Sequence, residues 1–283
     1  MRIHPTAVVS PLARIGQDVV IHSFCVVEAG AEIGDGCVLQ SRVVVKEGTR
    51  LGAHNRVFEG AVLGGLPQHI RMPPEVGGLA IGDANTIREN VTVHRALEAG
   101  STTRIGDHNL LMVGVHVAHD CHLGSHVIVA NNTMLAGHVE VGDRAYVSGA
   151  VGVHQFCRIG SLAMVGGQAH VVKDVPPYVT VDGKSTFIVG LNLVGLRRAG
   201  YSLEQIEQLK AAYRLIYRSG LRWNEMLARL AEEFSAGPAA LFHEFFSGGK
   251  RGFTPERRLP RTLRLPHEAA PESAETEQRA KAG

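Results

Sequence analysis

Residues 105–130, IGDHNLLMVGVHVAHDCHLGSHVIVA, carry an aliphatic residue at every sixth position, at Ile105, Leu111, Val117, Leu123 and Val129. The same period runs through most of residues 3–171, and glycine follows many of these aliphatic residues, as in IGDGCV at 33–38. Neither the helical period of 3.6 nor the alternation of an ordinary strand produces a six-residue repeat. Such a repeat is typical of a parallel β-helix, whose short strands each direct one aliphatic side chain inward. The sequence therefore predicts a mainly β fold in which three hexapeptides form one coil of 18 residues.

The composition excludes several classes of protein. The chain has 283 residues, a net charge of +2 and no basic block, so nucleic acid is not expected as a partner. The N-terminal residues contain no apolar run long enough for a signal peptide or a membrane span, and we expect a cytoplasmic protein. The four cysteines show no C-x-x-C spacing. Cys121 and Cys157 lie two coils apart, about 9.6 Å at the strand spacing, which is too far for a disulfide, so free thiols are expected.

Two coils are longer than the others. With a coil starting at Ile105, the remaining coils start at Ile15, Ile33, Leu51, Ile81, Leu123, Val141 and Ile159, and residues 1–14 form a partial coil. The coil 51–80 has 30 residues and the coil 81–104 has 24, and in both the repeat fails on the third face. We therefore expect two loops, at 64–78 and 94–103, to leave the body one above the other. Loops on a rigid scaffold are where function tends to concentrate.

Several histidines share a position within their coils. Histidines 13 to 15 residues after a coil start are His94, His119, His138 and His154, and those 11 residues after one are His116 and His170. Since successive coils stack about 4.8 Å apart, the first four are expected to line the edge from which the loops emerge. The alternative to a functional cluster is that these are ordinary surface histidines on turns.

A zinc site is a second alternative interpretation of these histidines. The zinc site of hexapeptide carbonic anhydrases needs an H-x-x-x-x-H pair, and no such pair occurs between His94 and His170. His116, His119 and His122 on an extended strand would point to alternating faces. We therefore expect no metal site.

Five segments together resemble one family of hexapeptide enzymes. They are NLLMVGVHVAHDCHLG (109–124), VANNTMLAGHV (129–139), GAVGVHQFCRIG (149–160), AMVGGQAHVVKDVPPYV (163–179) and YRLIYRSG (213–220). This set resembles the UDP-N-acetylglucosamine O-acyltransferases of lipid A biosynthesis over roughly residues 1–250. The resemblance implies a left-handed β-helix and a homotrimer with active sites between neighbouring subunits. It also implies transfer of an (R)-3-hydroxyacyl chain from acyl carrier protein to the 3-position of UDP-N-acetylglucosamine, without a cofactor.

The resemblance also implies catalytic roles. His119 matches the general base of the family, and imidazole suits proton removal at neutral pH. Asp120 would hold that imidazole in one tautomer. Gly137 matches the residue whose backbone N–H stabilises the oxyanion, and His138 beside it matches a substrate contact.

Most of the remaining site residues follow from the same resemblance, whereas His94 follows from the coil register and Arg71 from its place in the first loop. Residues expected to contact the sugar or nucleotide are Gln68, Arg71, His94, His116, Gln155, Asn192 and Arg198. Gly167 matches the residue that limits acyl-chain length, and its lack of a side chain should admit a long chain. The family's acceptor-binding pattern is altered at His69, Arg71, Val194 and Ala199. A paralogue that acylates a related UDP-amino sugar on O or N therefore stays open, as does a non-catalytic β-helix scaffold.

The C-terminal part changes to helical patterns. Residues 1–186 are expected to form the β-helix, 187–253 a helical domain and 254–283 a disordered tail rich in proline, alanine and charge. The first helix of this domain begins after Ser202, with Gln205 completing a capping box. Two more helices are expected at 222–234 and 238–247. Arg214, Arg218 and Arg222 gather near the end of the first helix, either as a solvated face or as a dock for acidic acyl carrier protein.

Overall fold

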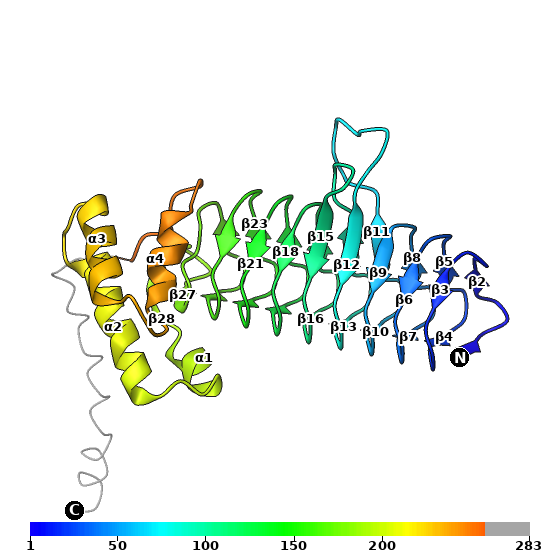
Figure 1. The fold of residues 1–283 in the computed structure, drawn as a ribbon, viewed down its shortest axis with the longest axis horizontal. Coiled ribbons are helices and arrows are strands. Elements are labelled where there is room, and N and C mark those ends of the chain that lie inside the picture. Colours follow the sequence, from blue (N-terminus) through cyan, green and yellow to red (C-terminus); the bar gives the residue numbers. More distant parts are fainter. Residues whose placement is uncertain (258–283) are drawn as a thin grey trace, which may run out of the picture.

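The computed structural model describes residues 1–257 and confirms the parallel β-helix predicted from the hexapeptide repeat. Its strands lie in three sheets that form the sides of a long prism, with the N-terminus at one end and the helices at the other (Figure 1). Among the described residues, the 11-stranded sheet contains, in stacking order, β1 (Arg2–Ile3), β4 (Val20–Ile21), β7 (Val38–Leu39), β10 (Arg56–Val57), β13 (Thr86–Ile87), β16 (Leu110–Leu111), β19 (Ile128–Val129), β22 (Tyr146–Val147), β25 (Met164–Val165), β27 (Val179–Val181) and β28 (Ile188–Leu191). The nine-stranded sheet contains β2 (Val8–Val9), β5 (Val26–Val27), β8 (Val44–Val45), β11 (Val62–Gly65), β14 (Thr92–His94), β17 (His116–Val117), β20 (Met134–Leu135), β23 (Gly152–Val153) and β26 (His170–Val171). The eight-stranded sheet contains β3 (Arg14–Ile15), β6 (Glu32–Ile33), β9 (Thr49–Leu51), β12 (Gly78–Ile81), β15 (Thr102–Ile105), β18 (His122–Leu123), β21 (Glu140–Val141) and β24 (Arg158–Ile159).

The aliphatic residue of each hexapeptide fills the interior of the prism. From Ile21 to Val171 these residues are at most 4% exposed, and each pairs in register with its counterpart one coil away, as Leu111 does with Val129. Burying one such side chain stabilises the fold by about 1.5–3 kcal/mol. The four cysteines are buried free thiols, as expected.

Two loops project from the same corner of the prism, as the coil lengths predicted (Figure 1). Residues 66–77 connect β11 to β12, and residues 95–101 connect β14 to β15. The amide of Gly77 donates to the Ala96 carbonyl at 2.9 Å, so the loops also support each other. This corner lies between the nine-stranded and eight-stranded sheets, and both loops stand over the turn that carries His119.

The β-helix ends later than residue 186, where we expected the boundary. β28 (Ile188–Leu191) joins the 11-stranded sheet by antiparallel pairing with β27, and Ile188 belongs to the core of the prism. Antiparallel pairing reverses the chain direction and ends the coils. A short helix that the sequence patterns did not predict, α1 (Leu193–Arg198), follows directly.

Three further helices cover the last coil of the prism. They are α2 (Leu203–Arg218), α3 (Trp223–Glu233) and α4 (Ala240–Ser247), as predicted, and Ser202 and Gln205 form the expected capping box. Their apolar faces pack on Leu162 and Tyr178 of the β-helix. Within residues 1–257 no helix is both long and apolar enough to cross a membrane.

The chain after α4 returns to the β-helix. The amide of Thr254 donates to the Asp174 carbonyl, and Glu256 accepts hydrogen bonds from Tyr213 and Arg218. Residues 254–257 are therefore ordered against the body, contrary to our expectation that the disordered tail begins at 254. The rest of the expected tail, 258–283, lies outside the described residues.

Candidate active site

A cavity of about 710 Å³ lies at the corner beneath the first loop. It is lined by Gln68, His69, Gly114, His116, Ala118, His119, Met134, Ala136, Gly137, Gly152, Val153, His154, Gln155 and His170. Five residues of the predicted site are among them: Gln68, His116, His119, Gly137 and Gln155. The structure thus brings together residues that are up to 87 positions apart in the sequence (68 to 155).

His119 and Asp120 form a hydrogen-bonded pair at the edge of this cavity. His119 Nδ1 lies 2.8 Å from Asp120 Oδ2, and the two side chains are 11% and 13% exposed. The second loop supplies a further donor, because the Leu97 amide lies 3.0 Å from the same oxygen. A carboxylate at Nδ1 requires the proton on that nitrogen, which leaves Nε2 as the unprotonated nitrogen of the neutral ring.

Hydrogen bonding determines the charge of Asp120. Burial is the largest single influence and would raise the pKa of this carboxyl, but the hydrogen bonds from His119, the Leu97 amide and Ser101, together with the attraction of His138, lower the pKa overall. Asp120 is therefore an anion at neutral pH. The backbone amide of Asp120 also donates to Thr103 Oγ1 at 2.8 Å, which fixes the turn that holds the pair.

The coil register explains the position of the pair. His119, Gly137 and Gln155 occupy equivalent positions in successive coils, and so do Asp120 and His138. Asp120 and His138 have positive φ values of 58° and 60°, so this turn position adopts the left-handed conformation in both coils.

Gly137 has no room for a side chain. A Cβ at this position would lie 2.7 Å from His119 Cε1 and 2.8 Å from Nε2. The imidazole therefore rests against the backbone of the next coil. Within residues 1–257 the Gly137 N–H makes no hydrogen bond, so it is available to a ligand.

The other histidines at this corner make ring contacts with His119 and with each other. The ring of His138 lies 5.3 Å from His119 and stacks on Phe156, whereas His94 packs edge-on against His116 at 5.1 Å. Burial lowers the pKa of His116 to about 4, with His94 as a smaller cause, so His116 is neutral at pH 7. Burial likewise lowers the pKa of His94 and of His138, in the latter case against the attraction of Asp120.

His69 is a site residue that the sequence did not identify as such. Its ring lies 5.7 Å from the His119 ring, in an edge-on arrangement. The sequence showed it only as a departure from the family pattern in the loop. The loop fold, in which His69 Nδ1 accepts from the Arg71 amide at 3.2 Å, brings it to the base.

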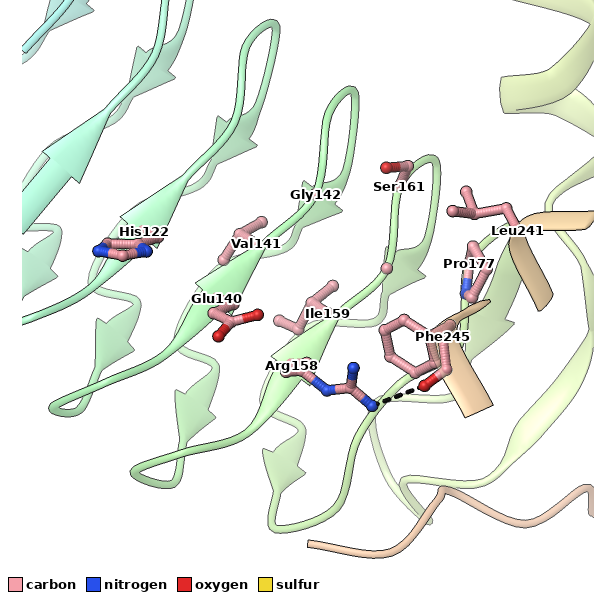
Figure 2. Close-up of a pocket in the computed structure, with 11 residues that line it drawn as sticks. His122, Glu140, Val141, Gly142, Arg158, Ile159, Ser161, Pro177, Leu241 and Phe245 are labelled. Atoms are coloured by element: carbon pink, nitrogen blue, oxygen red, sulfur yellow. Dashed lines mark hydrogen bonds between the residues drawn. The ribbon is translucent and has the colours of Figure 1, made fainter. Parts of the chain in front are cut away.

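Asp120 and His138 also line a second cavity, of about 560 Å³, together with Arg104, Phe156 and Lys250. Beyond it a groove of about 370 Å³ runs between the eight-stranded sheet and α4. In that groove Arg158 reaches from β24 to the Phe245 carbonyl (Figure 2). The His119–Asp120 pair therefore lies between two open spaces.

A metal ion is a geometric alternative at this point. The ligand atoms of His119, Asp120 and His138 lie within 4.8 Å of one another, a convergence that the sequence spacing did not suggest. The contacts already present favour a hydrogen-bonded pair, because Asp120 Oδ2 accepts both from His119 and from the Leu97 amide.

The remaining predicted residues do not line the His119 cavity in the single chain. His94 adjoins it through His116, and Arg71 is exposed in the first loop. Asn192 caps α1, with its side chain bonded to the Gly195 amide and the Leu162 carbonyl. The predicted residues that are exposed on other parts of the surface, away from the His119 cavity, are Gly167, Arg198, Arg214, Arg218 and Arg222.

Comparisons with known proteins agree with one family. The bacterial transferase hexapeptide model matches residues 12–47 and 102–137, and the model described as UDP N-acetylglucosamine O-acyltransferase, domain 2, matches residues 174–254. The acyl-(acyl-carrier-protein)–UDP-N-acetylglucosamine O-acyltransferase of Halorhodospira halophila is 52% identical over 83% of this chain and 91% of its own length. The enzyme of that name from Burkholderia lata is 49% identical over 89% of this chain and 98% of its own.

Solved structures give the same result. The UDP-N-acetylglucosamine acyltransferase of Bacteroides fragilis superposes with a TM-score of 0.85 at 40% identity, covering 89% of this chain and 99% of its own. The protein from Acinetobacter baumannii gives 0.86 at 40% identity, covering 90% and 100%. The chain belongs to the acyl-(acyl-carrier-protein)–UDP-N-acetylglucosamine O-acyltransferase family.

Proposed function

We propose that this protein transfers an (R)-3-hydroxyacyl chain from acyl carrier protein to the 3-hydroxyl of UDP-N-acetylglucosamine, the first step of lipid A biosynthesis. The observation that carries the proposal is the His119–Asp120 pair, whose unprotonated Nε2 lies against Gly137 at the 710 Å³ cavity. The names of the relatives supply the substrates.

In the proposed reaction His119 acts as general base. Nε2 takes the proton of the acceptor hydroxyl while the oxygen forms a bond to the thioester carbonyl carbon. The Gly137 N–H donates to the resulting oxyanion. When the C–S bond breaks, the thiol sulfur receives the proton from His119, and Asp120 stabilises the imidazolium between these steps.

The acceptor is less closely defined than the donor. His69 stands beside the base where the family pattern has an acid, so a related UDP-amino sugar, acylated on O or N, is the second candidate. The deciding assay offers hydroxyacyl carrier proteins of several chain lengths to the purified protein with a panel of UDP-amino sugars. Turnover of UDP-N-acetylglucosamine above all others supports the proposal, and turnover with none would favour a non-catalytic scaffold.

The assembly and partners are part of the same proposal. We infer a cytoplasmic homotrimer in which Asn192, Arg198 and Gly167 complete the site from surfaces outside the single-chain cavity. For carrier-protein docking, Arg214 and Arg222 are exposed and have no ion pair within residues 1–257, whereas Arg218 is bound to Glu256 at 2.7 Å. Charge reversal at Arg214 or Arg222 should therefore raise the KM for acyl carrier protein more than reversal at Arg218.

Gly137→Ala should lower kcat by about tenfold to a hundredfold, because the new methyl group displaces the His119 ring. Steady-state kinetics and thermal unfolding measure the effect. Gly152→Ala is the comparison, since a Cβ there meets only His170 Cδ2 at 3.9 Å in the same cavity. Equal losses in the two variants would show that crowding of the cavity, and not displacement of the base, is responsible.

Gly167→Met should shift the preference toward shorter acyl chains. A Cβ at Gly167 would meet Gly149 O at 3.4 Å and Ser148 Cβ at 3.9 Å, so the fold accommodates the side chain and the added length extends outward. Competition between carrier proteins loaded with different chains measures the preference, with Gly167→Ala as the intermediate step. An unchanged chain-length profile in both variants would refute the role of this position.

A further inference from the structure

The C-terminal segment, residues 248–257, brings an arginine to one of the cavity histidines. Arg251 Nη2 lies 3.0 Å from His154 Nδ1, although 97 positions separate the two residues. His154 lines the His119 cavity, together with Gln155 from the same turn. Arg251 itself is not among the residues that line the His119 cavity, whereas Lys250 of the same segment lines the second cavity.

The segment is fixed around Arg251 by contacts to a buried acid. The Asp174 amide donates to the Gly252 carbonyl and the Thr254 amide donates to the Asp174 carbonyl, both at 2.9 Å. The Asp174 side chain is itself bound to Arg158, which also holds the Phe245 carbonyl at the end of α4 (Figure 2). Arg251 is thus placed by backbone hydrogen bonds next to it and not by its own side chain.

Among the hydrogen bonds of residues 1–257, the Arg251 guanidinium has His154 as its partner, and it also lies near the Cys157 thiol, where it counteracts the burial that raises the pKa of that thiol. Within residues 1–257 its Nε is buried and has no hydrogen-bond partner. An unpaired buried donor costs stability, so the contact of Nη2 with His154 is the main polar interaction that this placement gains.

The contact determines which His154 nitrogen carries the proton. His154 Nδ1 lies 3.0 Å from Arg251 Nη2 and 3.1 Å from the Gln155 carbonyl, so it has one donor and one acceptor as neighbours. A guanidinium has N–H donors and no acceptor, so a protonated Nδ1 would place two donors against each other. With Arg251 present, Nδ1 accepts and Nε2 carries the proton.

We propose that Arg251 is a positioning residue that fixes His154 in the Nε2–H tautomer, so that His154 offers a hydrogen-bond donor to an oxygen of the sugar nucleotide. Without Arg251, Nδ1–H donates to the Gln155 carbonyl and Nε2 becomes an acceptor. That His154 binds the sugar nucleotide rests on the proposed function, whereas the tautomer of His154 does not. The C-terminal segment therefore sets the hydrogen-bonding polarity of His154, a histidine that lines the His119 cavity.

The tautomer can be measured directly on the full-length protein. Histidine-selective ¹⁵N labelling and ¹H–¹⁵N NMR distinguish the two tautomers, and the His154 signals are assigned by their loss in His154→Gln. We expect Nε2–H in the wild type, Nδ1–H in Arg251→Met and a return to Nε2–H in Arg251→Lys, which keeps a cationic donor. Nδ1–H in the wild type, or the same tautomer in the wild type and Arg251→Met, would overturn the proposal.

Kinetics on the same variants test the consequence. Arg251→Met should raise the KM for the sugar nucleotide about threefold to tenfold, the loss of one hydrogen bond, with recovery in Arg251→Lys. Arg257→Met is the control, because it removes an arginine from the same segment that contacts Asp182 and not His154. A changed tautomer with unchanged KM would refute the ligand contact alone. If the wild type itself acylates no sugar nucleotide, the proposed function fails while the tautomer remains testable.

Discussion

His119→Ala should lower kcat by about 10²- to 10⁴-fold, the range that a positioned general base contributes. Within residues 1–257, His119 is the histidine whose Nδ1 is hydrogen-bonded to Asp120, and its Nε2 lies against the Gly137 backbone. His138 lies farther from the same carboxylate oxygen, at 4.0 Å. Single-turnover assays with saturating substrates measure the chemical step directly. Circular dichroism and size-exclusion chromatography show whether the fold and assembly are retained.

The matched control for this experiment is His126→Ala. His126 is exposed at a different corner of the prism, where it stacks on His108 at 5.0 Å. His126→Ala removes a surface histidine that does not line the His119 cavity. Activity should therefore be unchanged in this variant. If His119→Ala keeps more than about a tenth of the wild-type rate, the general-base assignment is wrong.

Asp120→Asn should lower kcat by about 10²- to 10³-fold while leaving the KM values nearly unchanged. The amide removes the negative charge that stabilises the imidazolium, and its oxygen is a weaker acceptor than the carboxylate oxygen that now accepts from both His119 and the Leu97 amide. Because the pKa of Asp120 is lowered, the carboxylate charge is present at neutral pH and is lost only as the pH falls through that lowered value. Loss of wild-type activity near pH 6 is therefore not expected from protonation of Asp120.

Asp107→Asn is the control for this second experiment. Asp107 Oδ1 accepts a hydrogen bond from the Asp83 amide at 2.7 Å, on another corner of the prism. The same substitution at Asp107 therefore shows how much the loss of such a carboxylate affects the stability of a coil away from the active site. A profile of kcat against pH should show the deficit of Asp120→Asn at every pH where His119 acts as a base. Full activity in Asp120→Asn would mean that the carboxylate neither orients nor stabilises the imidazole.

The fold could be predicted from the sequence because the repeat leaves little choice. A period of six requires that the same residue of each hexapeptide points inward, and the register between coils then follows from the count of residues. For the same reason the position of both loops, and the stacking of Gly137 on His119, follow from coil length. The capping box at Ser202 and Gln205 could be predicted because a helix N-cap depends on only a few adjacent residues.

Other features depend on contacts that no local pattern encodes. β28 forms because the chain reverses and pairs with β27, and α1 is too short to produce a helical period. His69 reaches the base only through the fold of an irregular loop. Arg251 reaches His154 because Asp174 fixes the C-terminal segment 77 positions further along the chain (174 to 251).

The sequence by itself determined the β-helix and its two loops, since an 18-residue coil and the two longer coils specify them. It indicated the His119–Asp120 pair through the family resemblance of the residues around it. The tertiary structure decided the orientation and chemical state of the site. Burial and hydrogen bonds decide which nitrogen of His119 faces the cavity and why Asp120 is charged. They also decide why His116 is neutral and, through Arg251, which nitrogen of His154 carries the proton. Such interactions act over a few ångströms in space, and separation along the chain does not measure that distance.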